Sequence, residues 1–380
     1  MRFQVNRDVF SESASFVARL LPARATVPVL SGVLISSTDD GISFSSFDYE
    51  VSSTTAVVAD VEEPGRVLVS GRLLNDIAAR LPQAPVTVFT EESRVRVVCG
   101  SASFSLPSMP VEEYPTIPSV DSRSGVLPGE AFAEAVAQVS VAASKDDVTP
   151  VITGVQLEVG DGSLSLVATD RYRVAVRDIQ WQAEGTEPGT TALVPVRTIV
   201  EVGKAFGHAA TVEVAIVSRD DRELIAFSAD RRTITSLLIK GNFPPVKRLF
   251  PESVENYAVV NTGELIEATT RVQTVLEREA ALRFSFSADG LTLEAAGSEQ
   301  AQASESVDAT LAGAEIVVSL KPQFLLEGLR ATHSEFTRIS FTRTENPNKP
   351  GPVLITAQTS RDQQGTDAYR YLLQPNLLLR

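Results

Sequence analysis

The sequence predicts an α+β protein built from one unit that occurs three times along the chain. An Asp-Gly turn flanked by alternating apolar residues recurs at Gly41, Gly162 and Gly290, at intervals of 121 and 128 residues. Such a pattern is typical of a β-hairpin. A helical segment lies before each turn, and a short strand that runs into a second helix follows it. Three periods of about 125 residues account for the 380 residues of the chain.

The first helix of each unit begins with a carboxylate. Asp8, Glu130 and Glu264 take the same place, where a negative charge is favoured by the positive end of a helix. Apolar residues follow at helical spacing in all three segments. The six helical segments are expected at 7–24, 72–80, 130–145, 197–208, 264–279 and 321–330. Each unit should therefore hold two helices packed on antiparallel sheets of about six to eight strands.

Proline-rich segments separate the units. EEYPTIPSVDSRSG and NFPPVKRLFPESV interrupt the alternating pattern after the first and second copies, and proline and glycine mark loops and linkers. The expected domains are residues 1–122, 123–252 and 253–380.

Composition excludes several classes of protein. The N-terminus lacks the apolar stretch of a signal peptide and no run approaches 18 apolar residues, so a cytoplasmic location is expected. The lone Cys99 rules out an intramolecular disulfide, and its alternating segment indicates a packed residue rather than a nucleophile. The sequence has no nucleotide-binding glycine motif, no zinc-ligand spacing and no nucleophile elbow. No catalytic residue, cofactor or metal is predicted.

The net charge of −14 argues against nucleic-acid binding only if the charge is evenly spread. The six predicted helical segments hold 12 lysines and arginines against 11 acidic residues, so the acidity lies outside the helices. Arg72, Arg197 and Lys321 occupy the same register at the start of the second helix. A cation there opposes the helix dipole, which leaves two interpretations: solvated boundary residues, or phosphate contacts that use the free N–H groups of the helix start.

In its residues the chain resembles the bacterial DNA polymerase III beta subunit, the replicative sliding clamp. The segments that carry the resemblance are MRFQV, PARATVPVLSGVLI, VATDRYRVAV, GNFPPVKRLFP, SLKPQFLLEGL and YRYLLQP. The resemblance implies three DNA-clamp domains that form half of a ring, and a head-to-tail homodimer that closes it. It also implies a non-catalytic processivity factor that encircles double-stranded DNA without sequence preference. Polymerase, clamp loader and repair proteins would dock through short linear peptides, and no membrane partner is implied.

The resemblance assigns three groups of residues. The expected DNA-binding residues are Arg24, Arg72, Arg197 and Lys321. The expected dimer interface comprises Phe104, Leu106, Thr274 and Val275. The expected peptide-binding pocket comprises Ile152, Thr169, Arg171, Tyr172, Arg173, Val174, Pro244, Arg248, Leu249, Leu372, Leu373, Gln374, Pro375 and Asn376. Aliphatic walls and arginines suit the anchors, carbonyls and acidic flanks of a peptide.

Two features depart from the family pattern, and two alternative functions stay open. Arg171-Tyr172 stands where many relatives carry a smaller pair, and the tail QPNLLLR leaves Leu377–Leu379 without an assigned role. One alternative is a scaffold of the same repeated domains that never closes a ring. The other is a carboxylate-dependent hydrolase, which would need two carboxylates that converge in a deep cleft.

Overall fold

The first helix of each repeat has an acidic first turn, and in the first and third repeats an asparagine caps the helix start. The Asn6 side chain accepts the backbone N–H of Asp8 at 2.8 Å, and Asn261 accepts that of Glu264 at 3.1 Å. These bonds satisfy amide groups that a helix start leaves without partners. In our computed structural model of the chain, the helices are α1 (Arg7–Ala18), α2 (Gly71–Ala78), α3 (Gly129–Ser140), α4 (Val196–Phe206), α5 (Thr262–Val272) and α6 (Pro322–Arg330).

The structure describes all residues except 23, 220–221, 278–279, 297–300, 343–350, 364, 366–367 and 377–380. Within the described chain, no helix is both long enough and apolar enough to span a membrane. The first helix of each repeat ends earlier than expected, since the predicted segments included the turns that follow α1, α3 and α5.

Twenty-seven strands are present in the described part of the chain, nine in each repeat. The first repeat contains β1 (Arg2–Val5), β2 (Gly32–Thr38), β3 (Gly41–Phe47), β4 (Val51–Val58), β5 (Asp60–Glu63), β6 (Arg66–Ser70), β7 (Val86–Glu91), β8 (Arg94–Cys99) and β9 (Ala102–Met109). The second contains β10 (Gly125–Pro128), β11 (Gly154–Val159), β12 (Ser163–Thr169), β13 (Arg173–Gln180), β14 (Gln182–Ala183), β15 (Thr191–Pro195), β16 (Thr211–Arg219), β17 (Arg222–Ala229) and β18 (Arg232–Leu237). The third contains β19 (Tyr257–Asn261), β20 (Leu282–Ser287), β21 (Gly290–Ala296), β22 (Gln302–Val307), β23 (Ala309–Ala312), β24 (Ile316–Leu320), β25 (Phe336–Phe341), β26 (Val353–Gln358) and β27 (Tyr369–Leu373).

The expectation of six to eight strands per repeat was therefore too low. The strands β5, β14 and β23 have four, two and four residues. A strand of that length is too short to display the alternation by which strands are found in a sequence. All strand pairs in the described chain are antiparallel, as predicted.

Contacts between residues divide the chain into two compact units. Unit 1 comprises Met1–Ala133, Trp181–Glu187 and Arg197–Leu238, and unit 2 comprises Glu134–Gln180, Pro188–Val196 and Ile239–Arg380. The second repeat thus contributes strands to both units.

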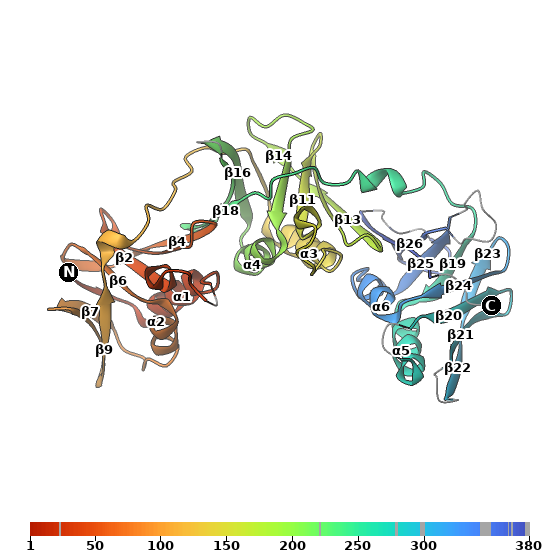
Figure 1. Cartoon of the computed structure of the whole chain (residues 1–380), viewed down its shortest axis with the longest axis horizontal. Helices are drawn as coiled ribbons and strands as arrows, with labels where there is room; N and C mark the ends of the chain where they lie inside the picture. The colour runs from red at the N-terminus through yellow and green to blue at the C-terminus, as the bar shows by residue number, and fades with distance from the viewer. Residues whose placement is uncertain are drawn as a thin grey trace. The chain divides into compact units, whose positions relative to one another are not determined.

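Unit 1 contains one continuous sheet of fourteen strands in which the first and second repeats are joined. The junction is the pair β18–β4, whose register runs from Arg232 opposite Thr55 to Ser236 opposite Val51. In the first repeat, α1 contacts α2 as well as β3 and β4. Both helices lie against the sheet (Figure 1), and Phe10 of α1 and Leu74 of α2 are among the residues that they bury.

Unit 2 contains a sheet of nine strands and one of four. The nine-stranded sheet joins the second and third repeats by the pair β27–β13, from Leu373 opposite Arg173 to Tyr369 opposite Arg177. Both junctions thus pair the last strand of one repeat with the fourth strand of the repeat before it, which is β4 in the first repeat and β13 in the second.

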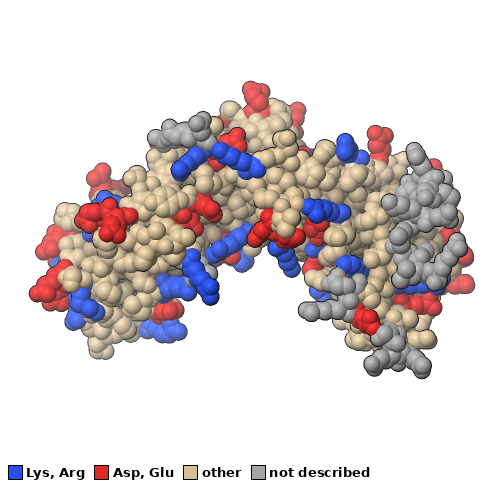
Figure 2. Space-filling view, in the orientation of Figure 1, with Lys and Arg blue, Asp and Glu red and all other residues tan. Residues whose placement is uncertain are grey.

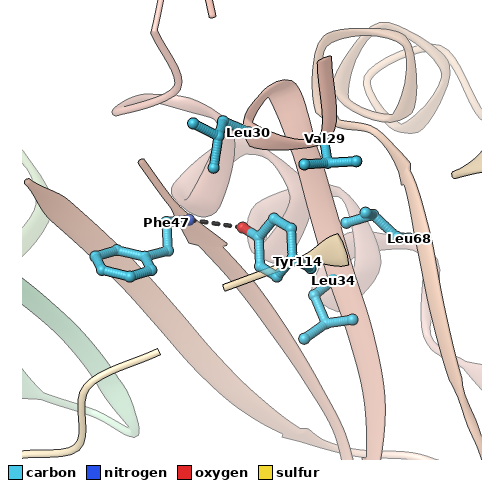
Figure 3. Packing of buried hydrophobic residues seen from close by; sticks show 6 residues of the cluster. All are labelled: Val29, Leu30, Leu34, Phe47, Leu68 and Tyr114. Atoms are coloured by element: carbon cyan, nitrogen blue, oxygen red, sulfur yellow. Dashed lines mark hydrogen bonds between the residues drawn. The ribbon is translucent and has the colours of Figure 1, made fainter. Parts of the chain in front are cut away.

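An apolar cluster in unit 1 fixes the start of the linker that follows β9. Tyr114 is buried among Val29, Leu30, Leu34 and other apolar side chains, as Figure 3 shows. Its hydroxyl accepts the backbone N–H of Phe47 at 2.7 Å. Burial raises the pKa of Tyr114 above its ordinary value, so the hydroxyl stays neutral.

Candidate functional site

The charged segment 169–173 of unit 2 is a hairpin tip held by an aspartate. Asp170 Oδ1 accepts the backbone N–H groups of Tyr172 and Arg173, each at 3.1 Å. Arg171 has a φ of 78°, a conformation that few residues without a short polar side chain adopt. The turn leaves the Tyr172 side chain 57% exposed, so this ring is available to a partner.

Arg173 has a different environment from the one expected of a docking residue. Only 4% of it is exposed, and its guanidinium is bound by partners within unit 2. It pairs with Asp170 at 2.9 Å and with Glu327 of α6, and it donates to the carbonyl of Val141 at 2.5 Å and to the hydroxyl of Tyr371 at 3.1 Å. Burial by itself would lower the pKa of Arg173, but the neighbouring Tyr371 and Glu327 raise it above its ordinary value. The side chain therefore joins the second repeat to the third.

Tyr172 belongs to an aromatic and cationic cluster beside a pocket. Its ring stacks on that of Phe324 in α6, with centroids 6.2 Å apart, and the Lys321 ammonium lies 5.6 Å and 5.5 Å from the two rings. The guanidinium carbon of Arg173 lies 4.2 Å from the centroid of the Phe324 ring. Cations near aromatic faces are attracted by the ring quadrupole. The pocket beside this cluster has a volume of about 550 Å³.

Four of the expected pocket residues line this pocket: Ile152, Arg171, Tyr172 and Arg173. Lys321, which was expected to bind DNA, also lines the pocket. Sequence reasoning missed the other lining residues, which are Ala143, Ser144, Lys145, Asp146, Thr149, Asp170, Gln323 and Phe324. The helical spacing of Lys321 and Phe324, three residues apart, could have indicated that both lie on one side of the start of α6. The segment 143–149 carries no comparable signal, because it is a loop placed by tertiary contacts.

Other expected residues form an apolar cluster on the same nine-stranded sheet. Val174 and Leu372 are buried with Val167 and Val176, and Phe243, Val246 and Phe250 of the interdomain linker pack on them. The linker contains the 3₁₀ turn η4 (Val246–Leu249). Lys247 in this turn binds Glu158 at 2.7 Å and Ser165 at 3.0 Å.

The linker also carries three of the expected pocket residues. Leu249 is 52% exposed and Arg248 is exposed, while Pro244 is half-buried. An exposed leucine beside a buried apolar cluster is a surface that a peptide anchor can cover.

Backbone hydrogen bonds join the tail to the hairpin tip and to β24. Gln374 donates to the carbonyl of Tyr172 at 2.8 Å, and Asn376 donates to that of Ser319 at 2.8 Å. Thr169, Leu373 and Pro375 are buried, so they support the site rather than face a partner. Leu377–Leu379 lie outside the described residues.

Three of the expected DNA-binding cations meet in unit 1. Arg72 donates to the carbonyl of Pro22 at 3.5 Å and Arg197 to that of Leu21 at 3.4 Å, and Arg24 follows in the same loop and is exposed. In Figure 2, lysine and arginine side chains gather over the part of unit 1 where Figure 1 places α1 and α4. Lys321 is in unit 2, in the aromatic cluster described above.

The expected interface residues lie at or beside two sheet edges. Ala102–Pro107 of β9 pair only with β8 in the described chain, and β22 pairs only with β21. Phe104 is partly exposed on β9, whereas Leu106 is 1% exposed and packs in the core of unit 1. Thr274 and Val275 are in the turn η5 (Gln273–Val275), which contacts β21, and the Thr274 hydroxyl donates to the carbonyl of Arg271.

Cys99 is buried, as its alternating segment indicated, and its sulfur lies 3.2 Å from the carbonyl oxygens of Pro82 and Ala84. Among the residues that the structure describes, no three His, Cys, Asp or Glu side chains are grouped as metal ligands would be.

Comparison with known proteins identifies the family. Sequence models of the N-terminal, central and C-terminal domains of the DNA polymerase III beta subunit match residues 1–118, 126–245 and 247–362. The chain is 43% identical to the beta sliding clamp of Streptomyces coelicolor over 99% of both chains, and 45% identical to that of Micrococcus luteus over 82% of this chain and all of the relative. A Pseudomonas aeruginosa sliding clamp bound to griselimycin superposes with a TM-score of 0.89 at 26% identity, over the full length of both chains.

Three clamp domains in a row define a DNA replication protein of the sliding-clamp class. The chain belongs to the DNA polymerase III beta subunit family. It is accordingly a non-catalytic processivity subunit of that polymerase.

Proposed function

We propose that two copies of this chain associate head to tail into a closed ring that encircles duplex DNA. The observation that carries the proposal is the repeated strand junction. The last strand of repeat two pairs with β4 of repeat one, and the last strand of repeat three pairs with β13 of repeat two. In the described chain, two strands form no such junction: β9, the last strand of the first repeat, and β22, the fourth strand of the third repeat. A junction of the same kind between two chains would pair them and remove both edges.

The two junctions within the chain predict the register of the junction between chains. By their places in the hairpins, Ala102–Leu106 of β9 correspond to Arg232–Ser236 of β18, and residues 301–305 correspond to Val51–Thr55 of β4. This correspondence sets Ser103 opposite Ser304 of the second copy. Phe104 would lie on β9 within the interface, whereas Leu106 would support it from the core. Thr274 and Val275 flank the β21–β22 side.

The proposed DNA contacts are weak and independent of sequence. Arg24, Arg72 and Arg197 surround the loop after α1, and arginines at helix ends suit phosphate oxygens. A chain of net charge −14 does not attract DNA as a whole. Such contacts hold DNA usefully only if the protein encloses it, and they weaken as salt rises.

The proposed peptide-binding pocket lies in unit 2, beside Tyr172 and the linker. Exposed Tyr172 and Leu249 offer apolar surface, and Arg171 and Lys321 offer positive charge. A short peptide with apolar anchors and an acidic flank fits this combination. We propose that the polymerase, the clamp loader and repair proteins dock here, and that griselimycin binding by the relative reflects a pocket of this kind. The proposed location is the cytoplasm.

Engineered disulfides test the ring and its register. The double variant Ser103→Cys, Ser304→Cys should form a covalent dimer under mild oxidation, because directly opposed residues of antiparallel strands satisfy disulfide geometry. Both serines are exposed, so the chain should fold. The matched control Ser103→Cys, Ser306→Cys shifts the register by two residues and should remain largely uncrosslinked. A solution mass equal to one chain at micromolar concentration, without crosslinking, would contradict the proposal and favour the open scaffold.

Retention on DNA tests the enclosure. After loading, the ring should stay on nicked circular DNA at high salt and leave once the DNA is linearised. Equal retention on both would mean that the protein binds DNA directly rather than by enclosing it.

A further inference from the structure

Unit 1 contains a second hairpin tip with the geometry of the one beside the proposed pocket. Asp48 Oδ1 accepts the backbone N–H groups of Glu50 at 3.0 Å and of Val51 at 2.7 Å, as Asp170 does for Tyr172 and Arg173. Tyr49 has a φ of 75°, against 78° for Arg171. The two tips are therefore built alike, although their sequences, FDYEV and TDRYR, share little.

The end of each junction strand, β18 in unit 1 and β27 in unit 2, is attached to the hairpin tip in the same way. Leu237 donates to the carbonyl of Glu50 at 2.8 Å, as Gln374 donates to that of Tyr172 at 2.8 Å. In unit 1, the linker after β9 lines the site as well, through residues 115–119. This linker begins at Tyr114, which is fixed by its hydrogen bond to Phe47 (Figure 3). Ile117 packs on the same apolar cluster.

These elements enclose a pocket of about 560 Å³ within unit 1. Its walls are mostly apolar and include Phe47, Tyr49, Ile117, Leu224 and Leu237. Tyr49 is 52% exposed and its ring lies 5.6 Å from that of Phe47. Because the linker and the hairpin tip are both fixed by hydrogen bonds, the pocket is formed without a ligand.

The charges of this pocket differ from those of the pocket in unit 2. Arg222 is the one cation among the described residues that line it, and Glu50 is the one carboxylate. Arg222 and Leu224 are two residues apart in β17, so their side chains point to the same face, about 7 Å apart along the strand. An extended peptide that runs along this strand would therefore pair a carboxylate with Arg222 and place the side chain two residues away on Leu224.

We propose that this pocket of unit 1 is a second peptide-binding site, which takes an extended segment with an acidic residue and an aromatic or aliphatic residue at positions i and i+2. Glu50 disfavours segments with further carboxylates. The site thus selects less acidic peptides than the pocket of unit 2, which has an excess of positive charge: its lining includes Lys145, Arg171, Arg173 and Lys321 against Asp146 and Asp170. The proposal does not depend on polymerase docking in unit 2.

The test uses two seven-residue peptides, Gly-Ser-Asp-Ser-Phe-Ser-Gly and its counterpart with lysine in place of aspartate, each with 4-fluorophenylalanine as the aromatic residue. Fluorine NMR line broadening measures weak binding without a charged label. The protein is the full chain with Tyr172→Ala, which removes the exposed aromatic wall of the unit 2 pocket. The aspartate peptide should bind this chain, and the lysine peptide should bind it several-fold more weakly.

Charge reversal then assigns the site. Arg222→Glu should weaken the aspartate peptide about tenfold or more, since it removes a hydrogen bond between charged groups and sets two carboxylates against each other, and should strengthen the lysine peptide. Tyr49→Asn, which tolerates the positive φ, should weaken both peptides. Arg66→Glu changes an exposed arginine at the start of β6, outside the pocket lining, and should change neither affinity.

All three variants replace exposed side chains, so each should unfold at the temperature of the Tyr172→Ala parent. No binding of the aspartate peptide to the parent chain, or binding that Arg222→Glu and Tyr49→Asn both leave unchanged, would overturn the proposal. Failure of the circular-DNA experiment would leave this result untouched, because the two tests use different surfaces.

Discussion

Replacing Arg173 with methionine tests whether this buried arginine joins the second and third repeats. Methionine keeps much of the length of the side chain and removes the charge. The substitution leaves the carboxylates of Asp170 and Glu327, which are 13% and 24% exposed, without their cationic partner. It also removes donors to Val141 and Tyr371.

The expected loss of stability follows from these exposures. Removing one partner of a fully buried ion pair costs about 3–5 kcal/mol, because a charge stays buried without compensation. Water reaches Glu327 and to a lesser degree Asp170, so we expect the lower end, about 3 kcal/mol in the free energy of unfolding. Glu327→Gln should cost less, and the two substitutions together should cost less than the sum, with a coupling of about 1–3 kcal/mol.

Hydrogen exchange of the backbone amides of β13 and β27 is the assay, because it reports the local stability of the junction. Protection of these amides should fall in Arg173→Met, whereas that of β20 and β21, in the separate four-stranded sheet, should change less. Urea unfolding gives the accompanying global value. A loss below about 1 kcal/mol, or additive effects of the two substitutions, would refute the assignment of Arg173 as a structural link and return it to the docking surface.

Three further substitutions test other contacts. Tyr114→Phe leaves the buried N–H of Phe47 without its acceptor, and should lower the free energy of unfolding in urea by about 1–3 kcal/mol; an unchanged midpoint would contradict this. Arg271 holds the pKa of Glu305 below its ordinary value of 4.5, so the stabilisation by this pair is present above pH 4.5 and is lost as the pH falls through the lowered pKa. Thermal unfolding of Glu305→Gln should therefore differ from the parent chain at pH 7 and converge with it in strong acid, and a difference that persists there would exclude the pair as its cause. Lys247→Met removes a half-exposed ion pair and should cost only about 0.5 kcal/mol in urea unfolding, while proteolysis at η4 should become faster; equal cleavage rates would show that the lysine does not fix the linker.

The threefold repeat could be predicted from the sequence because the patterns that reveal it are local. Asp-Gly turns, alternating residues and acidic helix starts depend on a few neighbouring residues, and they recur in all three copies. The short strands β5, β14 and β23 escaped because they pair only through contacts with strands distant in sequence. The ends of the first helices were also placed too late, since each helix is followed by a turn that keeps the apolar pattern.

The sequence predicted which residues belong to the candidate site better than it predicted how they are arranged. Tyr172 and Leu249 are exposed, as a docking surface requires. Arg173 carries the same charge as Arg171 two residues earlier, yet the first is buried among carboxylates and the second is exposed. Alternation along a strand cannot decide which of two arginines is buried, because that depends on where Glu327 lies, and Glu327 is in another repeat.

By itself, then, the sequence determined the class of fold, the three repeats and the family, because periodic patterns and motifs are properties of the chain alone. Tertiary structure decided which cations meet. It brought Arg72 of α2 and Arg197 of α4 into contact with the loop after α1, and it set Lys321 against Tyr172 and Phe324. Equal register in the repeats did not give these residues equal surroundings, because each repeat packs against different neighbours.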